Sequence, residues 1–369
     1  MNREKTKENV RRLPLVAKIF FIMGGLSVIL YVLFMLSPAF SDFFNRYISS
    51  VLRAALAYAT SFIPFSMGEF FIILSPVILI SLAVLGSIKF SETWRDVFVF
   101  CGTVVSVLAL ILSLFTIGFA PAYRGTGLDE KLGIDRQDVS AQELYDTAII
   151  LSERINEEYK NIYYDMDTKF SVMPYELTDM NDLLIDAYGT VCDKYSFVQR
   201  LDSRIKPVML SELMSYTHIT GVYSFFTGEA NINVAFPDYT IPYTAAHELS
   251  HQRGIAREDE ANFMAFLVCI ESEDAYIRYS GYLNLYDYVM SALYGADKDM
   301  YYKALGAIPP QVQMERRAYS NFFKKYSEST ASKVSGVVND TSLKLQGTQG
   351  TKSYGMVVDL AVAYYKSGQ

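Results

Sequence analysis

The stretch YTAAHELSHQRGIAREDEANF, residues 243–263, carries the strongest pattern in this chain of 369 residues. It holds two of the three histidines, and His247, Glu248 and His251 fit the spacing H-E-x-x-H. In a helix, residues four apart share a face, so both imidazoles can reach one ion, and Zn²⁺ in a catalytic site takes three protein ligands. Glu248 stands beside the first ligand, where its carboxylate can act as general base and then as general acid. The pattern therefore predicts a helix with a catalytic zinc site.

The residues that follow predict a turn and a second helix. Gly254 can end the first helix, since glycine tolerates the left-handed conformation at the end of a helix. A helix that starts near Arg257 would then offer an acidic residue to the ion. Glu258 is the preferred third ligand and Glu260 is the alternative. Asn262 lies four residues after Glu258, so it could orient that carboxylate.

This stretch resembles the active site of zincin metallopeptidases of the glutamate-ligand (gluzincin) type. In these enzymes H-E-x-x-H is followed by a helix with a glutamate ligand, often within the pattern E-x-x-A-D. The segment EDEAN, residues 258–262, is similar to that pattern, with Asn262 where aspartate is usual. The resemblance implies a Zn²⁺-dependent peptidase. The histidine pair and Glu258 would hold the metal, and Glu248 would move the proton.

Nearly the full length of the chain also resembles an uncharacterised bacterial multi-span membrane-protein family. Members of that family have N-terminal spans and then a TGEANIN-like segment, here residues 227–233. The histidine stretch follows, and a KSYG…VDL segment lies near the C-terminus, here residues 352–360. This resemblance implies an architecture and no substrate.

Further segments bear on the expected site. Related enzymes use a downstream Tyr or His to stabilise the oxyanion, and Tyr354 is the candidate here. Residues 228–233, GEANIN, are either a sheet edge to which substrate adds as a strand or a core strand with two exposed asparagines. His218 is expected to be a structural or surface histidine, and the basic run 316–325 a solvated helix face.

Three apolar stretches predict a membrane anchor over residues 1–120. They contain no Asp, Glu, Lys or Arg, and each is long enough to cross a hydrocarbon core about 30 Å thick: 19–36, 70–88 and 97–120. The first is expected to be a retained anchor, since it is long for a cleaved signal peptide. Residues 48–65 carry Arg53 and end near Pro64, so a helix that lies in the interface is favoured over a fourth crossing.

Charge predicts an orientation and limits the partners. Lys and Arg are concentrated before the first span, which places the N-terminus in the cytoplasm and, with three crossings, the rest of the chain outside it. Residues 120–369 carry 23 Lys and Arg against 34 Asp and Glu. This acidity argues against nucleic acid as a partner. The expected partners are the lipid bilayer and a protein or peptide substrate, and the oligomeric state is left open.

The outer part is predicted to be a linker over 121–139 and a domain over 140–369. Ser140 followed three residues later by Glu143 predicts a capped helix. Further helices are expected over 180–198, 273–300 and 309–335.

Strand signals are few in this domain. The best is 221–236, with Gly228 as a turn. The expected fold class is therefore α+β and mostly helical, with a small sheet after three membrane helices. Cys192 and Cys269 lie in the domain, and their pairing is left open.

Two functions from different classes fit these features. The first is a membrane-anchored zinc metallopeptidase that hydrolyses envelope proteins or peptides with metal-activated water. The alternative is a zincin-like membrane sensor or transducer that binds a ligand or partner without steady turnover. A zinc staple fits less well, because closed sites take four protein ligands and no cysteine lies beside the histidines. An intramembrane protease is disfavoured because the motif lies more than 120 residues after the last span.

Overall fold

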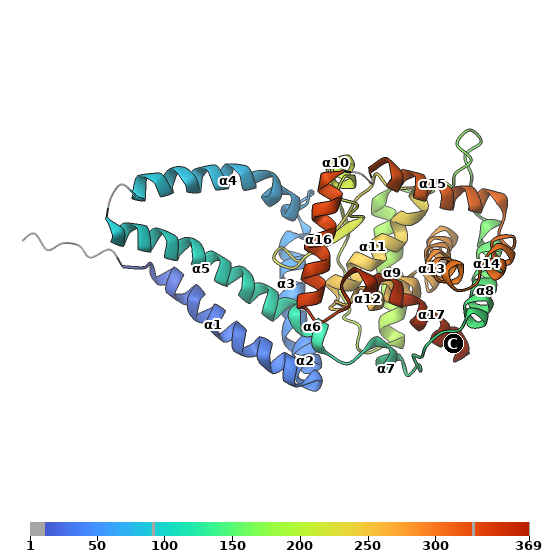
Figure 1. The fold of residues 1–369 in the computed structure, drawn as a ribbon, viewed down its shortest axis with the longest axis horizontal. Coiled ribbons are helices and arrows are strands. Elements are labelled where there is room, and N and C mark those ends of the chain that lie inside the picture. Colours follow the sequence, from blue (N-terminus) through green and yellow to red (C-terminus); the bar gives the residue numbers. More distant parts are fainter. Residues whose placement is uncertain (1–11, 91–92, 327–328, 369) are drawn as a thin grey trace, which may run out of the picture.

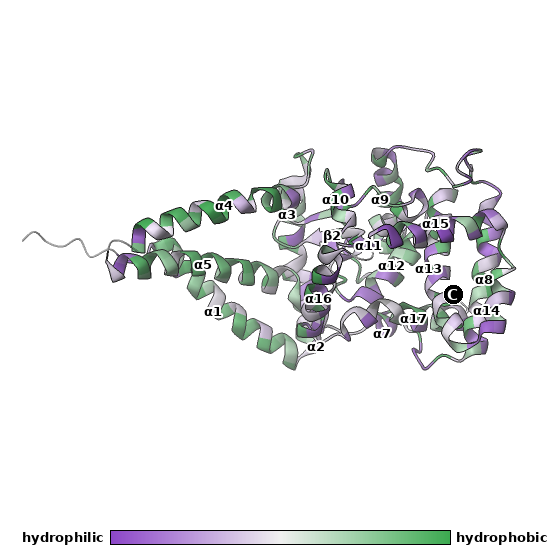
Figure 2. Cartoon of the chain, turned by 45° about the horizontal axis from the view of Figure 1, so that its top comes forward, coloured by the Kyte–Doolittle hydropathy of each residue, from purple (hydrophilic) through white to green (hydrophobic). Residues whose placement is uncertain are grey.

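The computed structural model describes residues 12–90, 93–326 and 329–368, apart from the side chain of Tyr354. Three of its helices are long and apolar enough to cross a membrane: α1 (Leu15–Leu36), α4 (Met67–Phe90) and α5 (Trp94–Gly118). They project from one side of a larger helical domain (Figure 1), and their residues are predominantly hydrophobic (Figure 2). The three predicted apolar helices are confirmed as candidate spans, with ends shifted by a few residues.

α1 and α5 pack closely against each other, whereas α4 makes fewer contacts with α5. Gly24 of α1 lies so close to α5 that an added Cβ would sit 3.0 Å from the Cβ of Ala109. Small residues at such crossings let two helix backbones approach closely. α4 meets α5 near their connection, where Gly86 faces the Phe100 ring, and then diverges from α5 towards the domain (Figure 1).

A bent segment joins α1 to α4: α2 (Pro38–Phe44), the π-helical turn η1 (Asn45–Ser49) and α3 (Ser50–Ser61). At 1.5 Å per residue, α3 is about 18 Å long, too short to cross a core about 30 Å thick. Among the described residues, no helix of this segment is one of the candidate membrane spans. Arg53 of α3 is buried and donates to Asn45 Oδ1 at 2.7 Å and to the Gly118 carbonyl at 2.9 Å. These bonds tie the segment to the end of α5.

The larger domain is mostly helical, as expected. α8 begins with the predicted capping box, in which Ser140 and Glu143 bond reciprocally. The helices of the domain are α6 (Ala120–Arg124), α7 (Leu128–Leu132), α8 (Ala141–Tyr159), α9 (Leu177–Lys194), α10 (Ser211–Ser215), α11 (Ile241–Gln252), α12 (Glu258–Ile270), α13 (Ala275–Ala296), α14 (Lys298–Leu305), α15 (Pro310–Tyr326), α16 (Thr330–Leu345) and α17 (Val357–Lys366), with the 3-10 turns η2 (Asp238–Thr240) and η3 (Gly350–Met356).

The stretch predicted as a linker, 121–139, is part of the packed domain. It contains most of α6 and all of α7, and Leu128, Leu132 and Ile134 are buried in the hydrophobic core. Its glycines lie at the ends of these short helices. Cys192 and Cys269, whose pairing was open, are both free.

The basic run 316–325 is not a uniformly solvated face, which corrects the expectation from the sequence. Arg316 forms an ion pair with Asp287 and lies over the Tyr286 ring at 5.0 Å. α15 therefore turns this guanidinium towards α13, where a carboxylate and an aromatic ring receive it.

Three short strands form a sheet in the order β1–β3–β2: β1 (Lys206–Pro207), β2 (Gly221–Ser224) and β3 (Glu229–Ile232). Of the two alternatives for residues 228–233, the sheet edge is wrong and the core strand is right, because β3 pairs with β1 on one side and with β2 on the other. Asn231 and Asn233 are buried rather than exposed, and their amides donate to the Val222 carbonyl and the Ser215 hydroxyl. Side-chain hydrogen bonds inside the domain thus explain polar residues that resemble a solvated strand face.

Candidate metal centre

α11 and α12 form one side of a cleft and are joined by a tight turn. Pro242 stands in the first turn of α11, where its missing N–H costs nothing. Gly254 after α11 has φ +88°, the left-handed conformation that the sequence predicts. α12 then begins at Glu258. Every residue of α11 is buried, both histidines included.

The structure brings His247, His251 and Glu258 together. The Nε2 atoms of the two histidines lie 3.0 Å apart. Glu258 Oε2 lies 3.2 Å from His247 Nε2 and 3.5 Å from His251 Nε2. Among the residues that the structure describes, this is the group of His, Cys, Asp and Glu side chains close enough together to share a metal ion.

The spacing of these three atoms fits a tetrahedral zinc ion. Ligand atoms about 2.0–2.2 Å from a tetrahedral centre lie about 3.3–3.6 Å from one another, and the observed separations fall near or slightly below that range. Glu258 Oε2 is buried and faces the two histidine rings, and it has no hydrogen-bond partner of regular geometry among the described residues. A buried carboxylate oxygen without a donor is costly unless a cation balances it. The residues present therefore suit a metal ion with one position left open.

A backbone carbonyl fixes the second histidine. His251 Nδ1 lies 2.8 Å from the Ile255 carbonyl, so the neutral ring carries its proton on Nδ1 and presents the Nε2 lone pair to the cluster. Burial alone would lower the pKa of His251, but the Glu258 carboxylate beside it raises that pKa to about 9 in the metal-free protein. Burial would raise the pKa of Glu258, but the histidines hold it well below its ordinary value.

Glu248 lies between the histidines in sequence and against β2 in space. The Tyr223 backbone N–H donates to its carboxylate. A Cβ at Gly221 would fall 2.6 Å from Glu248 Cγ, so this glycine leaves room for the side chain. Burial raises the pKa of Glu248 above its ordinary value. A raised pKa suits a carboxylate that accepts and returns a proton near neutral pH.

The other acidic residues in the first turn of α12 are engaged elsewhere. Glu260 accepts from the Leu128 N–H at 2.9 Å and pairs with Arg257 at 2.8 Å. Asp259 forms an ion pair outside the cluster. The structure therefore favours Glu258 over Glu260 as the third ligand, because α12 turns only the Glu258 carboxylate towards the histidines.

Two expected supporting residues are not placed at the cluster. The Asn262 amide lies beside the Tyr288 hydroxyl, and no hydrogen bond among the described residues joins it to Glu258. Tyr354 lies in η3, and its side chain is outside the described part of the chain, so its role stays a prediction.

His218 lines the same cleft, which the sequence did not indicate. Its backbone has φ +59°, and its ring meets the Phe323 ring edge-on at 5.0 Å. Its Nε2 is buried and has no hydrogen-bond partner among the described residues. Strain and an unpartnered polar atom in a cleft are typical of functional positions. The one signal in the sequence was the rarity of histidine in this chain.

The cleft has a volume of about 630 Å³, and its walls come from distant parts of the chain. Phe115 and Phe119 at the end of α5 form one wall, and the Phe119 ring lies 6.0 Å from the His251 ring. The cluster thus adjoins the end of a candidate membrane span. Distance along the sequence therefore does not keep the motif away from the membrane helices, because Phe119, directly after α5, lies beside His251. β2 forms a second wall and one face of α16 a third, with Ser335, Val338, Asn339 and Ser342.

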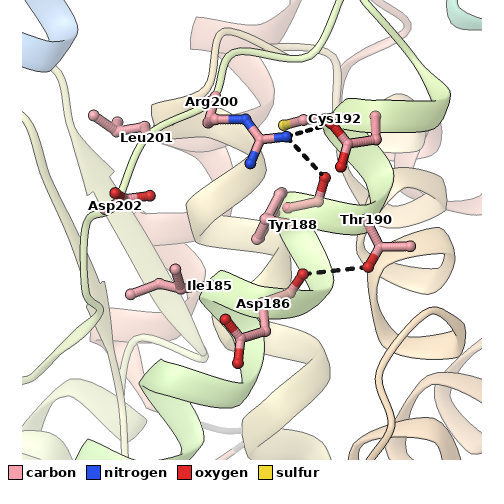
Figure 3. Close-up of a pocket in the computed structure, with 10 residues that line it drawn as sticks. Ile185, Asp186, Tyr188, Thr190, Cys192, Arg200, Leu201 and Asp202 are labelled. Carbon is pink, nitrogen blue, oxygen red and sulfur yellow. Dashed lines mark hydrogen bonds and ion pairs between the residues drawn. The ribbon is translucent and has the colours of Figure 1, made fainter.

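A second cavity, of about 420 Å³, lies beside α9 on another part of the domain (Figure 3). Its one arginine is paired locally: Arg200 pairs with Asp193 at 2.5 Å and donates to the Gly189 carbonyl. Thr190 donates to the Asp186 carbonyl of the preceding turn. These contacts are those of a solvated helix surface, so the metal cluster remains the stronger candidate for function.

Comparison with known proteins identifies the family of the chain. No curated protein and no solved structure matches it. A family model matches residues 40–362, well over half of the chain, from within α2 to within α17. The matched region includes His247, His251 and Glu258, the candidate metal ligands, and the other residues that line the cleft. The chain belongs to the family described as "Protein of unknown function (DUF3810)".

Proposed function

We propose that this protein is a membrane-anchored zinc metallopeptidase of the gluzincin type, with His247, His251 and Glu258 as zinc ligands. The proposal rests on one observation above all: the three ligand atoms converge at separations of 3.0, 3.2 and 3.5 Å. A bound zinc ion would supply a Lewis acid that polarises the peptide carbonyl and lowers the pKa of water.

Glu248 supplies the proton transfer in this proposal. Its carboxylate takes a proton from the attacking water and later passes it to the leaving amine. The hydrogen bond from the Tyr223 N–H orients the carboxylate, and burial keeps its pKa raised. Since holding a metal ion does not require this residue, its place in the cleft favours a peptidase over a sensor.

The charge that develops on the carbonyl oxygen also needs a donor. His218 Nε2 and Tyr223 Oη are buried, have no hydrogen-bond partner among the described residues, and belong to side chains that line the cleft. We assign this role to one of these two residues. Tyr354, the candidate from sequence, stays a third possibility.

The proposal includes a location and a substrate class. The basic residues before α1 favour a cytoplasmic N-terminus, which with three crossings would put the histidines and Glu258 outside the cytoplasm. The substrates are then proteins or peptides of the cell envelope, or peptide bonds in cell-wall material.

The test is the zinc content and peptidase activity of the full-length protein in detergent or lipid. Elemental analysis should find about one zinc per chain, and His251→Ala should lose it. Glu248→Gln should keep the zinc and lose about 10²- to 10⁴-fold in activity against a peptide pool, the usual contribution of a general acid–base group.

The outcomes separate the two functions. Zinc in the folded wild-type protein with no turnover above that of Glu248→Gln would favour the sensor or transducer. No zinc in the folded wild-type protein, with the metal supplied, would refute the metallopeptidase proposal.

A further inference from the structure

An apolar groove adjoins the metal cleft. It has a volume of about 460 Å³ and lies between the start of α4, the α10 region and β2. The groove and the cleft share four residues of the β2 region: Ile219, Val222, Tyr223 and Phe225. The two spaces therefore adjoin each other along β2.

Hydrophobic side chains line most of this groove, among them Ile72 and Ile73 of α4 and Leu213 of α10. The carboxylate of Glu69, at its rim, is already used, because it accepts from the N–H groups of Met209 and Leu210 at 2.9 and 2.8 Å. A charged segment placed here would lose its hydration and find no partner, whereas an apolar segment would gain from burial.

The groove opens at the level of the membrane helices. One of its walls is α4, which diverges from α5 towards the domain (Figure 1). The turn between β2 and β3 lies between these two helices. Its Phe226 ring is 6.3 Å from Phe71 of α4, and its Phe225 ring is 5.3 Å from Phe115 of α5. The groove therefore adjoins the apolar surfaces of α4 and α5, next to the position of the bilayer.

β2 connects the groove to the metal cluster and has a free edge. In an antiparallel pair, alternate residues direct their backbone groups to the partner strand. The hydrogen bond from the Asn233 N–H to the Thr220 carbonyl sets this alternation. Val222 therefore faces β3, and the backbone groups of Gly221 and Tyr223 face away from it. Tyr223 directs its N–H to Glu248 on that side. A peptide added along this edge would pass beside the candidate general base.

We propose that the substrate is a membrane protein cut next to one of its apolar segments. The apolar segment lies in the groove against α4, and the adjoining residues extend along β2 to the metal cluster. This inference rests on the proposed peptidase function. A lipid acyl chain would fill the groove equally well, but it has no backbone groups to pair with β2, so a peptide fits both features.

The test compares two substrates reconstituted in nanodiscs with the full-length protein. Both carry the same pool of short randomised peptides and the same apolar Leu/Ala helix of about 20 residues. In one the pool adjoins the helix, and in the other a long Gly/Ser spacer separates them, so both are tethered to the membrane. Burial of one or two apolar side chains should make the adjoining substrate react at least about tenfold faster. Glu248→Gln serves as the blank.

A matched pair of variants locates the effect in the groove. Leu213 and Met209 are both exposed, at 62% and 72%, and only Leu213 lines the groove. Leu213→Asp should bring the ratio of the two rates towards one, whereas Met209→Asp should preserve it. A photoreactive residue in the apolar helix should label α4 or α10 in the Glu248→Gln protein.

Failure of this inference differs from failure of the proposed function. Zinc-dependent cleavage at equal rates for both substrates would overturn the inference and leave the peptidase standing. Labelling of the groove by a photoreactive phospholipid but not by the peptide would make it a lipid site and also overturn the inference. Absence of zinc and of cleavage would remove the peptidase and the inference together.

Discussion

The two long sides of the cleft are built in opposite ways. On one side, every residue of α11 and all of α12 except its last residue are buried. On the other, Leu343 is the buried residue of α16, and Val334, Val337 and Val338 are 58%, 68% and 62% exposed.

Because of this difference, the candidate metal ligands lie on the tightly packed side of the cleft, and the exposed helix α16 borders the access to them. Side chains packed on all sides keep one rotamer, as a metal site requires. α16 is held chiefly near its ends, where Ser329 donates to the Tyr216 carbonyl and the Leu345 carbonyl accepts from Tyr31 and Arg124. We therefore expect changes in α11 and α12 to abolish metal binding and changes in α16 to have small effects on the fold.

The largest effect on zinc affinity should come from replacing Glu258, the candidate metal ligand in α12. Glu258→Gln removes the charge that faces the two histidines, and Glu260→Gln is the matched control, since Glu260 bonds Leu128 and Arg257 instead. Loss of groups that only orient metal ligands costs about 10- to 100-fold in affinity, so we expect loss of more than about 100-fold for Glu258→Gln. Zinc titration with a competing chelator measures it. Equal losses in both variants would show that Glu258 is not a ligand.

The next effect concerns β2, where it touches Glu248. A Cβ at Gly221 would lie 2.6 Å from Glu248 Cγ and 2.9 Å from the Asn231 carbonyl, so Gly221→Ala should displace the carboxylate and spare the metal. Misplacement by about 1 Å can cost about 100-fold in rate, so we expect kcat/KM to fall by about 10- to 100-fold with zinc content unchanged. Gly295→Ala is the control, since nothing lies within 4 Å of its added Cβ. Full activity in Gly221→Ala would argue against Glu248 as the base.

The buried side was also the part that the sequence could predict. The H-E-x-x-H spacing, the turn at Gly254 and the helix from Glu258 are local, so their geometry follows from positions a few residues apart. The other walls could not be predicted, because Phe119, His218 and Val338 come together only through tertiary packing. The choice of Glu258 over Glu260 needed the actual rotation of α12 about its axis.

The sheet shows why the pattern of polar and apolar residues was not enough to predict the surroundings of residues 228–233. Residues 228–233 alternate as a half-exposed strand would, yet β3 is central and fully buried. Asn231 and Asn233 find partners inside the domain. A single sequence gives the polarity of a side chain but not whether a buried partner satisfies it.

A smaller effect, about tenfold per pH unit, should appear in metal binding. The pKa of His251 is raised to about 9 in the metal-free protein, while Glu258 keeps its charge. A histidine ligand must be neutral, so zinc displaces the proton, and the apparent affinity should rise up to about tenfold per pH unit between pH 7 and 8 and level off above about pH 9. In the metal-free protein, this ion pair stabilises the fold fully below about pH 6.5, and its contribution is lost as the pH rises through about 9. Calorimetry in buffers of different ionisation enthalpy would count the proton released.

A flat affinity over this range would mean that His251 is already neutral at pH 7. The charge of Glu258 would then have to be balanced in another way. Glu258→Gln provides the control, since without that carboxylate the pKa of His251 should fall and the pH dependence should weaken.

The smallest effect tests the comparison directly, with the same substitution on both sides of the cleft. Val268 in α12 is fully buried and Val338 in α16 is 62% exposed, although Val338 lines the cleft. Val268→Ala should cost about 2 kcal/mol, because it leaves a cavity in packed surroundings, and lower the thermal midpoint by about 4–8 °C. Val338→Ala should change stability by about 0.5 kcal/mol or less. Equal destabilisation would mean that α16 is packed as tightly as α12. Access to the metal cluster would then be fixed by the same packed structure that holds its ligands, and the cleft would be rigid on both sides.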